Sequence, residues 1–177
     1  QHDRSTLDFL FAERTFVNAT LAKHYGIHLE FQGDEWREVS HARTHERGGL
    51  LPMSVFLTKN APGLRTSPVK RGYWVVRTLL GERIPPPPPD VPELPSDESK
   101  LGELTLSQTL AKHRDHESCA GCHNKIDPLG LVFEGFGPIG ERRDVDLGGR
   151  PVETAALFPD GTERNGVDNL RRYLREK

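Results

Sequence analysis

The chain has 177 residues, enough for one domain or one and a half. Its formal net charge is −2, which argues against the basic surface that binds nucleic acid. No apolar run approaches the ~20 residues that a membrane-spanning helix needs. The hydrophobic fraction of 34% and the mean hydropathy of −0.61 predict a thin apolar core.

The N-terminal stretch predicts a helix over residues 7–25. Ser5 or Thr6 can cap its start, and Gly26 follows its last turn. Leu10, Val17 and Leu21 recur at near-helical spacing along it, and we assign Phe9 and Phe16 beside them to the core.

Residues 27–47 have no clear period. Phe31, Trp36 and Val39 predict a short strand or a packed loop. Four histidines lie in or beside this region, and we interpret each as a solvated side chain: His24, His28, His41 and His45. The last two would share one face of a helix and could bind a metal ion, but nothing else nearby supports such a site.

Two apolar stretches come next. Residues 48–57 contain the only methionine, Met53, and glycines and a proline predict a fixed loop there. A helix follows, because Ser67 is a natural N-cap, Pro68 suits a first turn and Gly81 suits a C-terminal end.

A proline run at 84–95 includes five consecutive prolines. It predicts extended polyproline II backbone, which would act as a semi-rigid strap across the surface or as a spacer between lobes. Residues 97–102 are polar and predict a mobile segment. Thr105 then caps a third predicted helix that runs to about His113.

That helix leads into Cys119-Ala120-Gly121-Cys122-His123, a C-x-x-C-H run typical of c-type haem attachment. Two thiols three residues apart on one turn can each add to a haem vinyl group, and the histidine can supply the proximal iron ligand. These are the only two cysteines of the chain. A buried porphyrin would also add a large apolar body to a thin core. The motif therefore predicts one covalently attached haem c, held by Cys119, Cys122 and His123.

Three other interpretations of the motif stay open. A structural zinc site needs four ligands, and no second pair of cysteines is present. A thioredoxin-type dithiol needs a βαβ context, which the flanking sequence does not show. A disulfide between Cys119 and Cys122 would close a tight, strained ring. We therefore favour haem.

The sequence also offers candidates for the second axial ligand and for the partners of the haem propionates. A methionine thioether is a common axial ligand, so Met53 is a candidate, with core packing as an equal interpretation. His113, six residues before Cys119, is the main rival. Arg65 and Arg71 could bind the haem propionates, because guanidinium groups recognise carboxylates bidentately; a solvated charge is the alternative.

The C-terminal third of the sequence predicts an apolar segment that would pack against the cofactor, followed by a small hairpin. Residues 126–136 are mainly apolar and can bury the porphyrin. We expect a backbone carbonyl near Pro128 to accept the N–H of the proximal imidazole. Residues 151–164 predict a β-hairpin, and Asn165 can cap a final helix over 167–175.

Four segments carry a more specific signal than the C-x-x-C-H motif alone. They are Arg47-Gly48-Gly49-Leu50-Leu51, Arg65-Thr66-Ser67-Pro68-Val69-Lys70-Arg71-Gly72, the proline run, and the C-x-x-C-H motif continued by Ile126-Asp127-Pro128-Leu129-Gly130. Together they resemble the planctomycete-type cytochrome c domain of large, predicted secreted, multidomain proteins. The resemblance covers most of the chain. It implies haem c and export, carries over Cys119, Cys122 and His123, and gives no substrate.

The resemblance also implies a division of the chain into three parts. Residues 1–47 would be a helical segment from the tail of a preceding domain. Residues 48–145 would be the haem domain, including the proline-rich strap at 84–95. Residues 146–177 would begin a following domain. We therefore predict a mainly α fold with long irregular loops: a cytochrome c-like haem lobe, a helical N-terminal lobe and a small C-terminal hairpin.

The function expected from these observations is electron transfer, and we favour an electron carrier over a catalyst. Haem is attached to C-x-x-C-H motifs outside the cytoplasmic membrane, so we expect an exported, periplasmic protein whose leader is not in this sequence. Its partners would be a redox protein or other domains of a longer parent chain. The alternatives are a haem enzyme with an open sixth position for peroxide or a small ligand, and a structural haem domain that docks a larger partner.

Overall fold

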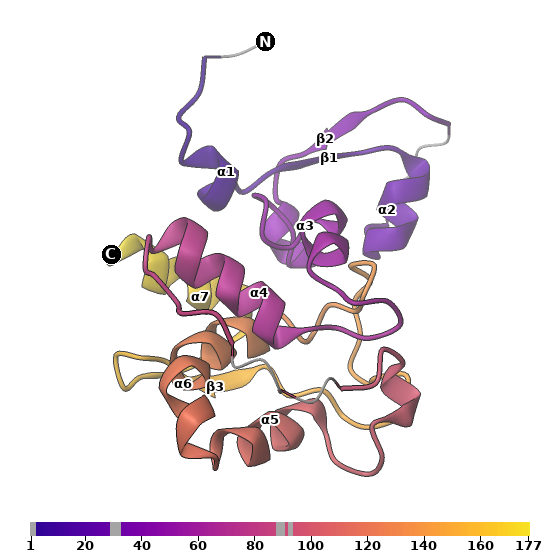
Figure 1. Cartoon of the computed structure of the whole chain (residues 1–177). Helices are drawn as coiled ribbons and strands as arrows, with labels where there is room; N and C mark the ends of the chain where they lie inside the picture. The colour runs from indigo at the N-terminus through magenta and orange to yellow at the C-terminus, as the bar shows by residue number, and fades with distance from the viewer. Residues whose placement is uncertain (1–2, 29–32, 88–90, 92–93) are drawn as a thin grey trace.

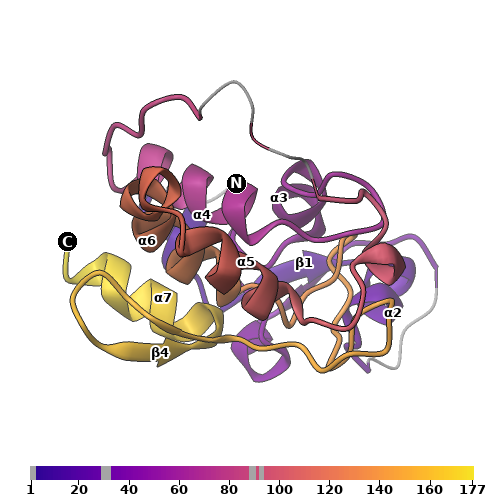
Figure 2. The same ribbon diagram turned by 60° about the horizontal axis from the view of Figure 1, so that its bottom comes forward.

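Three helices form the centre of the structure. The structure is a computed structural model that describes residues 3–28, 33–87, 91 and 94–177. Helix α4 spans Pro68–Trp74 and continues into a π-helical turn, Val75–Leu79. Helix α5 spans Leu106–Arg114 and α6 spans Glu117–Leu131, so a short turn joins them and they lie side by side (Figure 1 and Figure 2). Among the helices described, none has both the length and the apolar character needed to cross a bilayer.

Local caps explain where α4 and α5 begin. The Ser67 hydroxyl accepts a hydrogen bond from the backbone N–H of Lys70, and Pro68 occupies the first turn. Thr105 and Gln108 form a reciprocal capping box at the start of α5. The helices predicted from these two capping residues are confirmed.

Helices α4 and α6 cross with their backbones in close contact. A Cβ atom on Gly72 would lie 2.0 Å from the carbonyl oxygen of Ile126, and one on Gly130 would lie 1.9 Å from that of Pro68. Any side chain at either position would overlap the backbone of the other helix. The pairing of 72 with 126 and of 68 with 130 makes the two helices antiparallel. This crossing fixes the first half of α6 beside the C-terminal end of α4.

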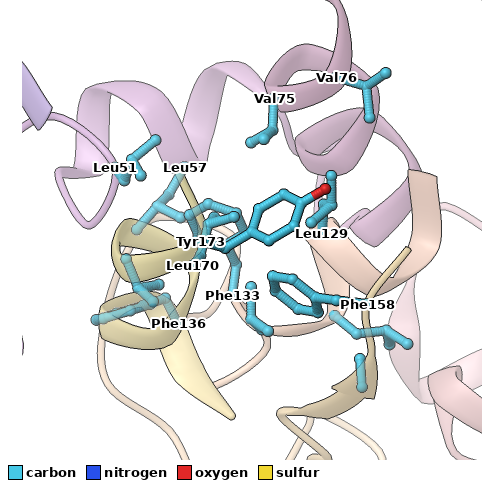
Figure 3. Packing of buried hydrophobic residues seen from close by; sticks show 14 of the residues in the cluster. Leu51, Leu57, Val75, Val76, Leu129, Phe133, Phe136, Phe158, Leu170 and Tyr173 are labelled. Carbon is cyan, nitrogen blue, oxygen red and sulfur yellow. The ribbon is translucent and has the colours of Figure 1, made fainter. Parts of the chain in front are cut away.

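The main hydrophobic core draws side chains from distant parts of the chain (Figure 3). Leu57 comes from α3, Ser54–Lys59, and Leu129 from α6. Phe158 and Tyr173 stack edge to face from the C-terminal region, with ring centroids 5.1 Å apart. Residues beyond 146 thus share one core with the predicted haem domain. The three-part division itself stays a prediction.

The predicted helix over residues 7–25 is wrong. The chain instead forms a single turn, α1 (Asp8–Phe11), a strand, β1 (Thr15–Val17), and a second helix, α2 (Ala19–Tyr25). Asn18 ends the strand and caps α2 by accepting from the N–H of Leu21. The strand pairs antiparallel with β2 (Arg37–Val39), which is the short strand predicted around Val39.

The strand also overturns the predicted burial of the two phenylalanines. Thr15 and Val17 point inward, so Phe16 between them is 51% exposed, and Phe9 is 70% exposed. Trp36 is exposed too, and Phe31 lies outside the described residues. Val17 belongs instead to a second small core that it forms with these residues: Ala22, Tyr25 and Ile27.

The predicted C-terminal hairpin is confirmed. Strands β3 (Ala155–Leu157) and β4 (Glu163–Asn165) pair antiparallel around the predicted turn. Helix α7, Gly166–Arg175, follows directly and packs its buried face into the main core. Asn165 occupies the N-cap position, but its side chain makes no capping bond and accepts instead from the hydroxyl of Thr154.

Residues 97–102, predicted to be a mobile polar segment, contribute Glu98 to a buried ionic network. Glu98 lies in a short 3-10 turn (Glu98–Lys100) and is fully buried. Its carboxylate is 2.6 Å from Nη1 of Arg143, whose Nη2 is 2.9 Å from the carboxylate of Glu134. Thr66 donates its hydroxyl to Glu134, which ties the network to the start of α4. The polar composition of this segment did not predict the burial of Glu98, because a charged side chain can lie inside a protein when it is paired.

We expect Gly130→Ala to lower the free energy of unfolding by at least ~1–3 kcal/mol, since the new methyl group would force α4 and α6 apart. Urea denaturation measures the change. Gly121→Ala is the matched control on the same helix, because nothing lies within 4 Å of its Cβ position. That variant should leave stability unchanged or raise it by up to ~1 kcal/mol through helix propensity. Equal effects of the two substitutions would contradict the close crossing.

Candidate functional site

The C-x-x-C-H motif lies on the first two turns of α6. The backbone at His116 is extended and marks the start of the helix. Cys119 and Cys122 are three residues apart on the helix, so they share one face. Both thiols are half-buried, and neither is bonded to another sulfur. The predicted alternative of a disulfide between them is not present in the structure.

A cavity of about 550 Å³ opens beside this face. That volume falls within the ~300–1,000 Å³ typical of ligand sites. One wall carries both cysteines and His123, and α4 contributes Tyr73 and Trp74. The remaining described lining comes from the end of α3, from α4 and α6, from α5 and from the proline run: Asn60, Val69, Lys70, Ile84, Pro85, Pro86, Pro87, Val91, His113, Ser118 and Ile126.

The proline run therefore forms part of the cavity wall. In Figure 2 the stretch that follows α4 arches away from the helices. Residues 84–87 form neither helix nor strand and line the cavity together with Val91. The described part of the predicted strap therefore lies beside the motif. The rest of it, residues 88–90 and 92–93, lies outside the described residues.

His123 is held by a buried carboxylate. Its Nδ1 lies 2.9 Å from Oδ1 of Asp127, one helical turn further along α6. Asp127 is fully buried, and its other oxygen is 2.8 Å from Nη1 of Arg114 on α5. When Nδ1–H donates to Asp127, the lone pair of Nε2 is left available for a metal ion. The prediction of a backbone carbonyl near Pro128 is wrong, because the spacing of four residues on a helix places this carboxylate within reach.

His113 lies against His123. Their ring centroids are 4.7 Å apart and the rings meet edge to face, at 71°. Burial lowers the pKa of His113, the positive charge of His123 adds to the shift, and the negative charge of Asp127 opposes it. Two imidazoles that ligate one iron must approach it from opposite faces of the porphyrin. In the observed arrangement they are in direct contact, so a distal role would require His113 to move.

The chain resembles one family model over most of the site. Residues 47–146 match the model of the PSCyt3 family, which is described as a protein of unknown function (DUF1588). The match spans more than half of the chain and includes α4, α5 and α6. The chain belongs to the PSCyt3 family. The resemblance to a planctomycete cytochrome-like domain is thereby confirmed at the level of the family, whose description assigns no activity.

Neither the curated proteins nor the solved structures contain a match to this chain. The cytochrome c-like arrangement of lobes therefore stays a prediction. The matched segment of the PSCyt3 chain differs by one residue at each end from the haem domain predicted at 48–145.

Met53, the predicted distal ligand, does not line the cavity of this PSCyt3 chain. It is half-buried at the N-cap position of α3, whereas Asn60, at the opposite end of that helix, lines the cavity. The structure therefore brings His113, and not Met53, beside His123.

Of the remaining histidines, His24 was predicted to be solvated, but it is half-buried and its Nε2 is 2.9 Å from the carbonyl of Ile139.

Neither Arg65 nor Arg71 lines the cavity, so the structure does not support propionate binding by either. Nε of Arg65 donates to the carbonyl of Pro95. Arg71 is fully buried and its terminal nitrogens donate to three carbonyls of the segment after α6: Phe133, Phe136 and Gly137. Desolvation lowers its pKa to about 10. Its role in the structure is to bind this segment to α4.

The residue pair that sequence reasoning missed is Asp127 with Arg114. The spacing His-x-x-x-Asp within a helix was a usable signal for the first. For Arg114 the sequence held no such signal, because its contact with Asp127 depends on how α5 turns back along α6.

The fit to a metal-bearing macrocycle rests on the free Nε2 of His123 and on two adjacent thiols at a largely apolar cavity. In the described part, no group of three or more His, Cys, Asp or Glu side chains is arranged to hold a bare metal ion.

We expect the imidazole of His113 to titrate below the ~6.5 of an unfolded histidine in protein prepared without cofactor. A depressed pKa means that the folded state resists protonation. Its contribution to stability is therefore present above pH ~6.5 and is lost as the pH falls below that value. NMR titration of the ring measures the midpoint. Asp127→Asn should lower the midpoint further, because it removes the charge that opposes the shift; a higher midpoint would contradict this electrostatic account.

Proposed function

We propose that this PSCyt3 chain is an exported c-type cytochrome domain that binds one haem covalently and transfers electrons. The observation that carries the proposal is the placement of Cys119, Cys122 and His123 on one wall of a single, largely apolar cavity. When bound, haem supplies an iron that alternates between two oxidation states. The periplasm is the expected location, and the electron partner is a redox protein or another domain of a longer parent chain.

The residues of the cavity have separate tasks in this proposal. With haem bound, the thiols of Cys119 and Cys122 would each add S–H across a haem vinyl group to give a thioether. Nε2 of His123 would supply the proximal ligand, in an orientation held by the hydrogen bond between Nδ1 and Asp127. Tyr73, Trp74 and the prolines of residues 85–87 supply apolar surface that excludes water. Lys70 is the described cavity residue with a permanent positive charge, so it takes the place of Arg65 and Arg71 as the candidate partner of a propionate.

A haem that binds a small ligand is the second candidate. It is favoured by the absence of Met53 from the described lining and by the contact between His113 and His123 on the same side. Neither predicted distal ligand faces His123 across the cavity. An iron with an open sixth position could bind peroxide or another small molecule.

The pyridine haemochrome assay tests the proposal on protein exported to a periplasm that matures c-type cytochromes. We expect the c-type spectrum, and colour that stays with the polypeptide after acid–acetone extraction. The double substitution Cys119→Ser with Cys122→Ser should release the haem, whereas Ser118→Ala on the same wall should retain it. A colourless wild-type protein with two titratable thiols would overturn the proposal.

We also expect Met53→Leu to leave the visible spectrum of the haem protein unchanged, because the side chain does not line the cavity. Leucine nearly conserves the volume, so the fold should tolerate it. His123→Ala should alter the spectrum, because it removes the proximal ligand. If Met53→Leu converted a low-spin spectrum into a high-spin one, Met53 would be an iron ligand after all.

A further inference from the structure

We propose that Asp127 and Arg114 act through His123 as opposing controls on the reduction potential of the haem iron, Asp127 lowering it and Arg114 raising it. This inference rests on the proposed function and adds to it two positioning residues outside the C-x-x-C-H motif.

The first step is the hydrogen bond between His123 and Asp127. Nδ1–H of the imidazole donates to Oδ1 at 2.9 Å. The acceptor is fully buried, and a hydrogen bond to an ionised group is stronger in such surroundings than in water. The carboxylate draws the proton toward itself, so the ring acquires partial imidazolate character and becomes a more basic ligand.

The second step concerns the iron. Ferric iron carries one more positive charge than ferrous iron, so a more anionic imidazole stabilises the ferric state more strongly. Hydrogen bonding around an axial ligand is one of the means by which a protein sets a haem potential. A carboxylate acceptor therefore lowers the potential relative to the neutral acceptor that the sequence had led us to expect near Pro128.

Arg114 moderates this effect from the neighbouring helix. Its Nη1 lies 2.8 Å from Oδ2 of Asp127, and its side chain is 25% exposed. The guanidinium attracts the negative charge of the carboxylate and so draws it away from the oxygen that faces His123. Because Arg114 belongs to α5 and the other two residues to α6, the strength of this effect depends on how the two helices pack.

A purely structural role for the same contacts makes a different prediction. If Asp127 only joined α5 to α6, its replacement would change stability and would leave the potential of correctly folded protein unchanged. If both residues act through His123, their replacement shifts the potential in opposite directions. The sign of each shift therefore separates the two roles.

The test is spectroelectrochemical titration of the covalently loaded haem protein. Asp127→Asn should raise the potential, with at least a tenfold change in the ferric-to-ferrous ratio at fixed potential, which is ~59 mV for one electron. Arg114→Gln should lower it, and Arg114→Lys, which keeps the charge, should stay close to wild type. Glu117→Gln is the control, because it removes an exposed carboxylate from the same helix and should have little effect.

A vibrational measurement reads the imidazole directly. Resonance Raman spectroscopy of the photolysed carbon monoxide complex gives the iron–histidine stretching frequency, which should fall in Asp127→Asn and rise in Arg114→Gln. If Asp127→Asn does not fold, the variants of the partly exposed Arg114 still test the sign. Covalent haem with an unmoved potential and frequency would overturn this inference alone. Wild-type protein without covalent haem would overturn the proposed function and this inference with it.

Discussion

The backbone contact between α4 and α6 fixes the geometry on which the cavity depends. Helices with side chains between them usually lie about 8–10 Å apart. Here Gly72 and Gly130 let each helix approach the carbonyl groups of the other. One wall of the cavity belongs to α6 and a second to α4, so the width between them is set by this crossing. A larger residue at either glycine would displace Cys119, Cys122 and His123 together.

Buried arginines hold the irregular segments of this protein in place, in addition to its small apolar core. Long irregular segments expose carbonyl groups that no helix or strand satisfies, and buried carbonyls need donors. Arg71 supplies them to the segment after α6, and Arg47 supplies them to Pro52 and Gly140. Arg47 also lies over the ring of Tyr25, with its guanidinium carbon 3.9 Å from the centroid. A low mean hydropathy is thus compatible with a folded interior, because buried guanidinium groups donate hydrogen bonds to carbonyl groups that helices and strands leave unsatisfied.

Local signals in the sequence predicted local structure correctly. They failed for features that depend on residues far away in the chain. The caps at Ser67 and Thr105 and the C-terminal hairpin depend on neighbouring residues and were predictable. The strand β1 was not, because its three residues are stabilised by β2, about twenty residues away. Arg71 was misassigned for the same reason: its positive charge suggested a haem propionate, but its partners are three backbone carbonyls and the buried carboxylate of Glu134, all more than sixty residues along the chain. The motif itself was predictable because all its parts lie on one helix.

The two candidate functions make different demands on the same cavity. An electron carrier needs a protein ligand on each side of the iron, so that its coordination does not change with oxidation state. A ligand-binding haem needs one strong proximal ligand and polar groups near an open position. In either proposal His123, hydrogen-bonded to Asp127, would supply the proximal ligand. The rest of the described wall supplies no thioether, and its polar atoms come from these residues: Asn60, Lys70, Tyr73, Trp74, His113 and Ser118. If haem binds as proposed, the identity of the sixth ligand would distinguish the two functions, and His113 could supply it only after separating from His123.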